Sequence, residues 1–91
     1  LDLLKRAINK YGEGNQIVVA IEEMSELQKE LCKTLRGDDN YPHVVEELAD
    51  VYIILNYIKI LYSIDGKELN DEINIKLNRL EARLDGKEID E

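Results

Sequence analysis

The chain has 91 residues, of which 44% are apolar, 20 are acidic and 12 are basic, and its net charge is −8. This length predicts one small domain over residues 1–91. The apolar content excludes a disordered chain. The negative charge argues against binding to a nucleic-acid polymer, which requires a basic surface. It leaves a nucleotide ligand open, because a metal ion can lie between protein carboxylates and phosphate.

Membrane insertion and disulfide bonding are not expected. The longest apolar runs, 17–21 and 51–55, have five residues each, whereas a membrane-spanning helix needs about 20. No signal-peptide pattern opens the sequence. Cys32 is the only cysteine, so an intrachain disulfide is impossible, as is common in a reducing cytosol. We therefore expect a cytoplasmic protein without a membrane partner.

Glycines separate stretches of helical periodicity, which predict helices over 2–11, 15–36, 41–63 and 67–84. Asn15 is the expected N-cap of the second helix, and Asn40 or Tyr41 that of the third, with Pro42 in its first turn. Nothing alternates with period two for long, and the short loops favour antiparallel neighbours. The predicted fold is all-α, a subunit of the four-helix-bundle type.

The second and fourth helices each carry one apolar stripe with steps of three and four residues, as expected for a core-facing side. The stripes are Ile17, Ala20, Ile21, Met24, Leu27, Leu31 and Leu35, and then Leu69, Ile73, Leu77, Leu80 and Leu84.

The third helix is apolar on two sides. One side comprises Val44, Val45, Leu48, Val51, Tyr52, Leu55, Ile58 and Tyr62, and the other comprises Ile54, Tyr57 and Leu61. A unit of four helices this small can cover only one side well, although both require cover. We therefore predict a subunit interface along this helix.

Two pairs of acidic residues have helical spacing. Glu23 and Glu26 are three residues apart, as are Glu47 and Asp50. Side chains at this spacing share a face, where two like charges repel unless a cation lies between them. Two such pairs on neighbouring antiparallel helices would bring four carboxylates together. Oxygen ligands favour Mg²⁺, Mn²⁺ or Ca²⁺ over zinc.

The residues alone leave a second interpretation open, which is a solvated acidic surface. Glu22, Glu23, Glu26 and Glu30 lie away from the apolar stripe of the second helix. Glu47 and Asp50, however, continue along the side that becomes Ile54, Tyr57 and Leu61, where unpaired charge is costly. A di-iron site is disfavoured, because no glutamate lies three residues before His43, the only histidine.

Taken together, the two motifs resemble a known family. Residues 22–26 read E-E-M-S-E and residues 47–50 read E-L-A-D, matching E-E-x-x-E and E-x-x-D. This pair resembles the MazG-like all-α nucleoside triphosphate pyrophosphohydrolases, a superfamily that includes dimeric dUTPases, dCTP pyrophosphatases and phosphoribosyl-ATP pyrophosphatase. The resemblance extends over about residues 10–84. It implies a MazG-like oligomer, either a homodimer or a homotetramer.

The resemblance also implies an activity and a site. The family hydrolyses a nucleoside triphosphate to the monophosphate and pyrophosphate with Mg²⁺, for which Mn²⁺ is a possible substitute. Its metal ligands correspond to Glu23, Glu26, Glu47 and Asp50. Glu22 would take a catalytic role, by binding a second Mg²⁺ or orienting the attacking water. Glu46 has no firm counterpart and is expected to be a surface acid.

Substrate contacts are less well specified. Lys76 and Arg79 flank the apolar stripe of the fourth helix and are candidates for binding phosphate, while Gln16 is a candidate for contacting the base. The aromatic residue that follows E-x-x-D by one turn in dCTP-selective relatives is here Ile54. The expected function is nucleotide-pool housekeeping by (d)NTP hydrolysis. The alternatives are a non-catalytic acidic module that oligomerises or, within the family, a phosphoribosyl-ATP pyrophosphatase.

Overall fold

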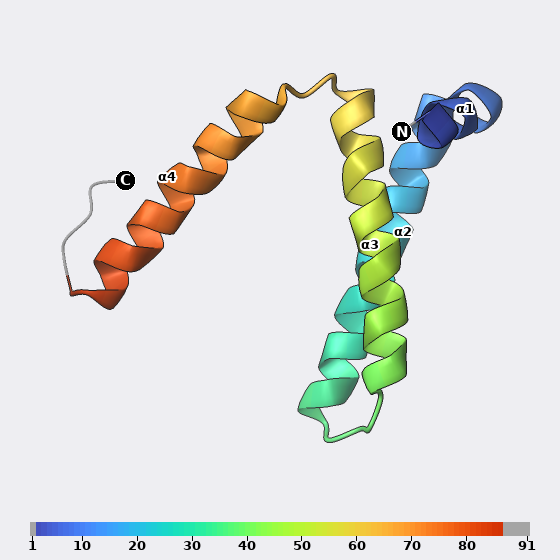
Figure 1. Cartoon of the computed structure of the whole chain (residues 1–91). Coiled ribbons are helices and arrows are strands. Elements are labelled where there is room, and N and C mark those ends of the chain that lie inside the picture. Colours follow the sequence, from blue (N-terminus) through green and yellow to red (C-terminus); the bar gives the residue numbers. More distant parts are fainter. Residues whose placement is uncertain (1, 87–91) are drawn as a thin grey trace.

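A computed structural model of the chain describes residues 2–86 (Figure 1). The described part consists of helices α1 (Asp2–Tyr11), α2 (Glu13–Leu35), α3 (Tyr41–Leu61) and α4 (Gly66–Leu84), and it contains no strand. The prediction of an all-α chain with four helices is therefore confirmed. The predicted boundaries differ from the observed ones by two residues at most, as at the start of α2 and the end of α3.

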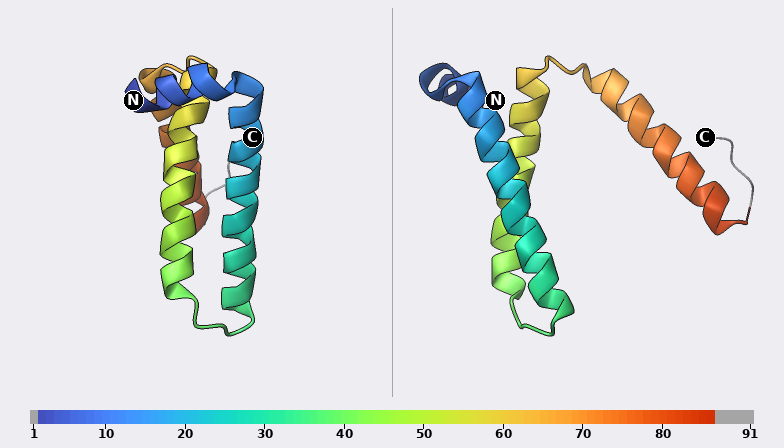
Figure 2. Two further views of the ribbon diagram at one scale, coloured as in Figure 1. Left: turned by 90° about the vertical axis from the view of Figure 1, so that its right-hand side faces the viewer. Right: turned by 180° about the vertical axis from the view of Figure 1, so that it is seen from behind.

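The helices α2 and α3 form an antiparallel hairpin, and α1 crosses one end of it and contacts both (Figure 2). A core of Ala20, Val51 and Ile54 lies between α2 and α3. Partly buried side chains surround this core, namely Val19, Met24, Leu27, Tyr57 and Ile58. The hairpin positions the acidic motifs opposite each other.

Helix α2 is rotated relative to the orientation that its apolar stripe predicts. Ile17, Ile21, Leu31 and Leu35 are exposed, whereas Gln16 and Glu30 are buried and Glu23 is half-buried. The prediction that Glu23 and Glu30 face away from the core is therefore wrong. The physical reason is that α2 contacts α3 through the edge of its stripe, at Ala20 and Leu27, which leaves the rest of the stripe in solvent.

Two predicted helix caps also differ from the structure. The N-cap of α2 is Gly12, with a φ of 93° that suits glycine, and the Asn15 side chain instead donates to the Tyr11 carbonyl. Asn40 is the N-cap residue of α3, with Pro42 in the first turn as predicted, but its side chain does not cap the helix. That side chain bonds to Glu30 across the loop.

Helix α4 stands apart from the hairpin (Figure 1) and, in the described part of the chain, contacts none of the other helices. None of its residues is buried. Its apolar stripe, predicted to face a core, is therefore uncovered within one chain. The four-helix bundle predicted for the subunit is not confirmed, because the described residues of a single chain pack only three helices together.

None of the helices in the described residues is both long enough and apolar enough to cross a membrane.

Candidate metal centre

Three carboxylates meet between α2 and α3. Glu23 projects from α2, while Glu47 and Asp50 lie one turn apart on α3. Each offers an oxygen atom, and these oxygens all lie within 4.8 Å of one another. All three residues are half-buried. The antiparallel pairing of the hairpin thus joins the E-E-x-x-E segment to the E-x-x-D segment.

We call Glu23, Glu47 and Asp50 the carboxylate cluster. Its most unusual atom belongs to Glu47. The Oε2 of this residue is buried and has no hydrogen-bond partner among residues 2–86. A buried acceptor without a partner is costly, and natural folds rarely keep one unless a bound group supplies the missing contact. Burial raises the pKa of Glu47, and the negative charges of Asp50 and Glu26 raise it further.

Glu23 is perturbed in the same direction. Burial raises its pKa, and a carboxyl–carboxyl hydrogen bond with Asp50 and the charge of Asp50 add to the effect. Such a hydrogen bond requires a proton on one of the two groups, because two ionised carboxylates cannot donate. A cation bound between the two carboxylates would relieve their repulsion.

The chemistry of the cluster fits a divalent cation bound by oxygen. The three carboxylates are hard ligands, which suit Mg²⁺, Mn²⁺ or Ca²⁺. Magnesium usually takes only one or two protein carboxylates and completes its shell with water and substrate phosphates. The unpartnered Oε2 of Glu47 is the observation from this structure that agrees best with a cation at this point.

The other two predicted acids of this region lie outside the cluster. Glu26 is exposed and does not join the three converging oxygens, although its charge raises the pKa of both Glu23 and Glu47. Glu22 is exposed and lines a neighbouring cleft. Their assignments as metal ligand and catalytic residue stay predictions.

The cleft beside the cluster has a volume of about 510 Å³. Its walls come from α1, α2 and α3, and its lining residues are Ala7, Tyr11, Asn15, Gln16, Val18, Val19, Glu22 and Tyr57. Val19 lies one turn before Glu23, and Tyr57 lies two turns after Asp50. The cleft therefore lies near the carboxylate cluster, although none of the three carboxylates lines it. Its volume lies within the range of small-molecule sites.

Gln16 is a polar residue in the wall of this cleft. It is 6% exposed, and its side-chain amide makes no hydrogen bond within residues 2–86. An amide with unused donors and an unused acceptor can recognise a ligand that presents both. Tyr11 and Tyr57 place aromatic rings in the same cleft. The contribution of α1 to this wall could not be predicted from the motifs, because α1 carries no acidic signature.

The basic residues predicted to bind phosphate are not brought to the cluster within one chain. Lys76 and Arg79 are on α4, which contacts none of the other helices in the described part of the chain. The cleft lies on the side of the hairpin that α1 occupies, and α4 lies off the other side (Figure 2). Their predicted role stays a prediction.

Glu30 is a buried acid that the sequence pattern placed in solvent. Its carboxylate accepts hydrogen bonds from Asn40 Nδ2 at 2.9 Å and from Lys33 Nζ at 3.1 Å. Thr34 Oγ1 donates to Asn40 Oδ1 at 3.0 Å, which fixes the amide. These contacts lower the pKa of Glu30, the bond from Asn40 most of all. They hold the α2–α3 loop and show no sign of a ligand site.

Comparisons with protein-family models, with curated proteins and with solved structures gave no match to this chain.

Proposed function

We propose that this chain is a Mg²⁺-dependent nucleoside triphosphate pyrophosphohydrolase, which converts a (d)NTP to the (d)NMP and pyrophosphate for nucleotide-pool housekeeping. The observation that carries the proposal is the buried, unpartnered Oε2 of Glu47 among three converging carboxylates. The cleft beside these carboxylates supports a substrate larger than a metal ion. The resemblance of residues 22–26 and 47–50 to the E-E-x-x-E and E-x-x-D motifs selects the reaction.

In this reaction water attacks the α-phosphorus, the α–β anhydride bond breaks, and the water's proton is released. Glu23, Glu47 and Asp50 would hold Mg²⁺, with Mn²⁺ as a possible substitute, and Glu26 would add charge from the edge. When bound, the ion neutralises charge on the phosphate oxygens. Glu22 borders the cleft beside Glu23, where its carboxylate would orient the attacking water and accept its proton.

The cleft would take the base and sugar. Gln16 would hydrogen-bond the edge of the base, since its amide can both donate and accept. Tyr11 or Tyr57 would stack on the ring. These residues differ from the aromatic residue that follows E-x-x-D in the dCTP-selective relatives. The base preference therefore has to be measured.

The acting unit would be a cytoplasmic homodimer or homotetramer. Lys76 and Arg79 are not part of this proposed site, because α4 does not approach the cluster of its own chain. The large exposed apolar side chains of α2, α3 and α4 support association.

The direct test is pyrophosphate release from a panel of the common NTPs and dNTPs and from phosphoribosyl-ATP, with Mg²⁺ and then with Mn²⁺. We expect release that is abolished by EDTA. A preference for phosphoribosyl-ATP would keep the chemistry and change the substrate. If high enzyme concentration releases no pyrophosphate from any of these substrates, the chain is not this enzyme, and a non-catalytic acidic module takes its place.

A further inference from the structure

Helix α4 has an uncovered apolar stripe, which we define as Leu69, Ile73, Leu77, Leu80 and Leu84. Four of these five side chains belong to the exposed hydrophobic residues, with exposed fractions from 44% at Ile73 to 77% at Leu84. A helix with a regular apolar stripe needs another surface to cover it. In the described residues of one chain, no other helix does so.

The hairpin has a second uncovered surface. We call it the apolar face, and it consists of Ile17, Ile21, Leu31 and Leu35 of α2 with Val45, Leu48, Tyr52 and Leu55 of α3. On each helix, the residues of the apolar face lie about 60–150° around the helix axis from the buried residues of that helix. The rotation has the same sense on both helices when each is followed from its N-terminus. Because α2 and α3 are antiparallel, equal rotations bring both sets to one side of the hairpin.

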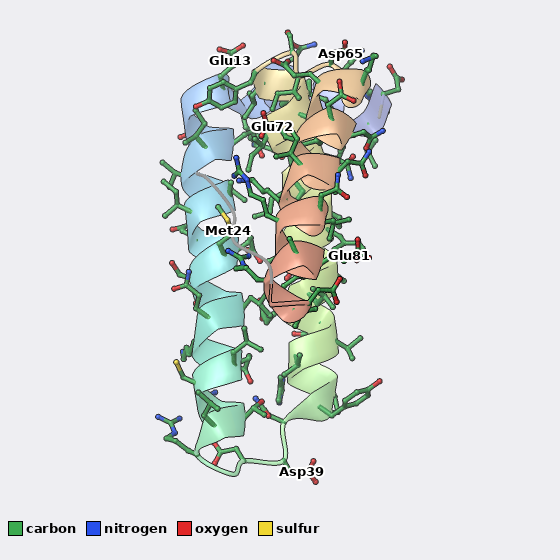
Figure 3. The ribbon with its side chains drawn as sticks, turned by 90° about the vertical axis from the view of Figure 1, so that its left-hand side faces the viewer. Glu13, Met24, Asp39, Asp65, Glu72 and Glu81 are labelled. Atoms are coloured by element: carbon green, nitrogen blue, oxygen red, sulfur yellow. The ribbon has the colours of Figure 1, made fainter. Side chains whose placement is uncertain are left out.

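The apolar face and α4 lie on the same side of the hairpin. Figure 3 views the molecule from the side of α4, and Met24 points toward that side from α2. Met24 lies between the core residues of α2 and the exposed Ile17 and Ile21 in rotation about the axis. Glu22 and Glu26 lie in the opposite rotational sense, so the apolar face is turned away from the acidic cleft. Covering it would leave the cleft open.

The size of the uncovered surface matches a stable dimer. The chain exposes 7362 Å², whereas a compact monomer of 10.5 kDa would expose about 5,400 Å². The excess, about 1,900 Å² per chain, lies within the range that each partner buries in obligate dimers, roughly 1,000–2,500 Å². The radius of gyration of 16.8 Å also exceeds the value of about 12 Å expected for a compact chain of this length.

The connection between α3 and α4 favours a second copy over closure within one chain. After α3, Ile64 N donates to the Lys59 carbonyl at 2.9 Å. Ser63 takes a φ of 51°, and Asp65 accepts from Lys67 N at 3.1 Å as the N-cap of α4. The end of α3 and the start of α4 are thus both capped within a short connection, which directs α4 away from the hairpin of its own chain.

We infer that α4 of one copy packs its apolar stripe on the apolar face of the α2–α3 hairpin of a second copy, and that the exchange is reciprocal. At 1.5 Å per residue, the 19 residues of α4 span about 28 Å and the 21 of α3 about 32 Å, so one α4 covers nearly the whole length of the face. Pairing of two hairpins without α4 would leave the α4 stripe in water. Reciprocal exchange covers both surfaces at once.

The first test is the dissociation constant of the dimer, from light scattering during dilution. Leu77→Asp places a charge in the stripe, and we expect the dimer to weaken at least about 30-fold, as for a central interface residue. The matched control is Ile75→Asp, because Ile75 is similarly exposed at 43% but lies about 160–240° around the helix from the stripe. Equal effects of the two variants, or a wild-type monomer at micromolar concentration, would overturn the inference.

The second test uses the wild-type chain and therefore avoids any failure to fold. Isotope-labelled and unlabelled chains are mixed, and NOEs between the two kinds of chain are recorded. We expect contacts between methyl groups of Leu77 or Leu80 on one chain and Leu48 or Leu55 on the other. If these contacts occur only within one chain, α4 closes on its own hairpin. If the contacts between chains join only hairpins, α4 is not exchanged. Either result contradicts the inference.

Discussion

The hairpin of α2 and α3 holds two groups of buried or half-buried acids, and they differ in what surrounds their charge. Glu30, near the loop, is 7% exposed and accepts hydrogen bonds from Asn40 and Lys33. Its pKa is lowered, first by the bond from Asn40. The carboxylate cluster nearer the middle of the hairpin has mainly acidic neighbours. The pKa of Glu23 and of Glu47 is raised, first by burial and then by nearby carboxyl groups.

The difference separates a structural acid from a candidate ligand. Both groups come from the same helix pair, so helix type and residue type do not distinguish them. At Glu30 the protein itself supplies the donors, and the buried charge stabilises a loop. At Glu47 one oxygen is buried without a donor. We propose that a bound cation balances this charge.

The largest expected effect follows from removing one charge of the cluster. Glu47→Gln keeps the shape of the side chain but removes the ligand charge, and we expect kcat/KM for pyrophosphate release to fall by at least about 100-fold, since even the loss of an outer partner of a metal ligand costs 10–100-fold. The control is Glu46→Gln, which changes an exposed neighbouring acid and should leave the rate within a few-fold. A Glu47→Gln variant with the full rate would exclude the proposed ligand set.

Disrupting the Glu30 group should affect stability and leave metal binding unchanged. Asn40→Ala removes the amide that donates to the Glu30 carboxylate and to the Glu30 carbonyl, so a buried acid loses its main partner. We expect a loss of about 1–3 kcal/mol in the free energy of unfolding, measured with urea. The affinity for Mn²⁺ should not change. A stable variant with weakened Mn²⁺ binding would reverse the distinction between the two groups.

Glu26→Gln should have an intermediate effect on metal affinity. It tests whether Glu26 belongs to the set of residues that bind the ion. Glu26 is exposed and outside the three converging oxygens, but its charge acts on Glu23 and Glu47. We expect metal affinity to fall by about 3–10-fold, consistent with the loss of a partly screened charge near the site. A loss as large as that of Glu47→Gln would show that Glu26 binds the ion directly when the site is loaded.

The smallest effect is on the pH dependence of the metal-free protein. The pKa values of Glu23 and Glu47 are raised above their ordinary 4.5, so the folded state retains protons that the unfolded state has released, and stability falls as the pH rises above 4.5. Glu30 has a lowered pKa, so its contribution is present above 4.5 and is lost as the pH falls further.

Thermal melting in EDTA checks this sign. The Tm of Glu47→Gln minus that of the wild type should grow more positive between pH 5 and pH 7.5, and added Mg²⁺ should remove most of the difference by stabilising the wild type. If the difference shrinks over this range, the assigned direction of the Glu47 pKa is wrong.

Much of this fold could be predicted from the sequence, because helix ends and apolar periodicity are local properties. The predicted spans of α1 and α4 agree closely with the structure, and the opposition of the two acidic motifs follows from antiparallel pairing. The rotation of α2 could not be predicted from its own stripe. Which edge of the stripe contacts α3 depends on the partner helix, so Glu30 was predicted to lie in solvent although it is buried.

The candidate site could be predicted only in part for the same reason. Spacing identified Glu23, Glu47 and Asp50, but it gave Glu26 equal weight, and only the three-dimensional arrangement separates them. The cleft forms because α1 crosses the hairpin, and no sequence motif predicts that crossing. The position of α4 relative to the hairpin could not be predicted either, because α4 follows a short connection at 62–65 and contacts no other helix in the described part of the chain.

The central claim is that the carboxylate cluster binds a divalent cation. The most direct measurement is Mn²⁺ binding, followed by electron paramagnetic resonance of the free ion during titration at pH 7.5, for the wild type and Glu47→Gln. The account predicts a saturable site in the wild type, competed by Mg²⁺ and lost or weakened at least about 10-fold in the variant. Equal binding by the two proteins, or no saturable binding by the wild type, would contradict it.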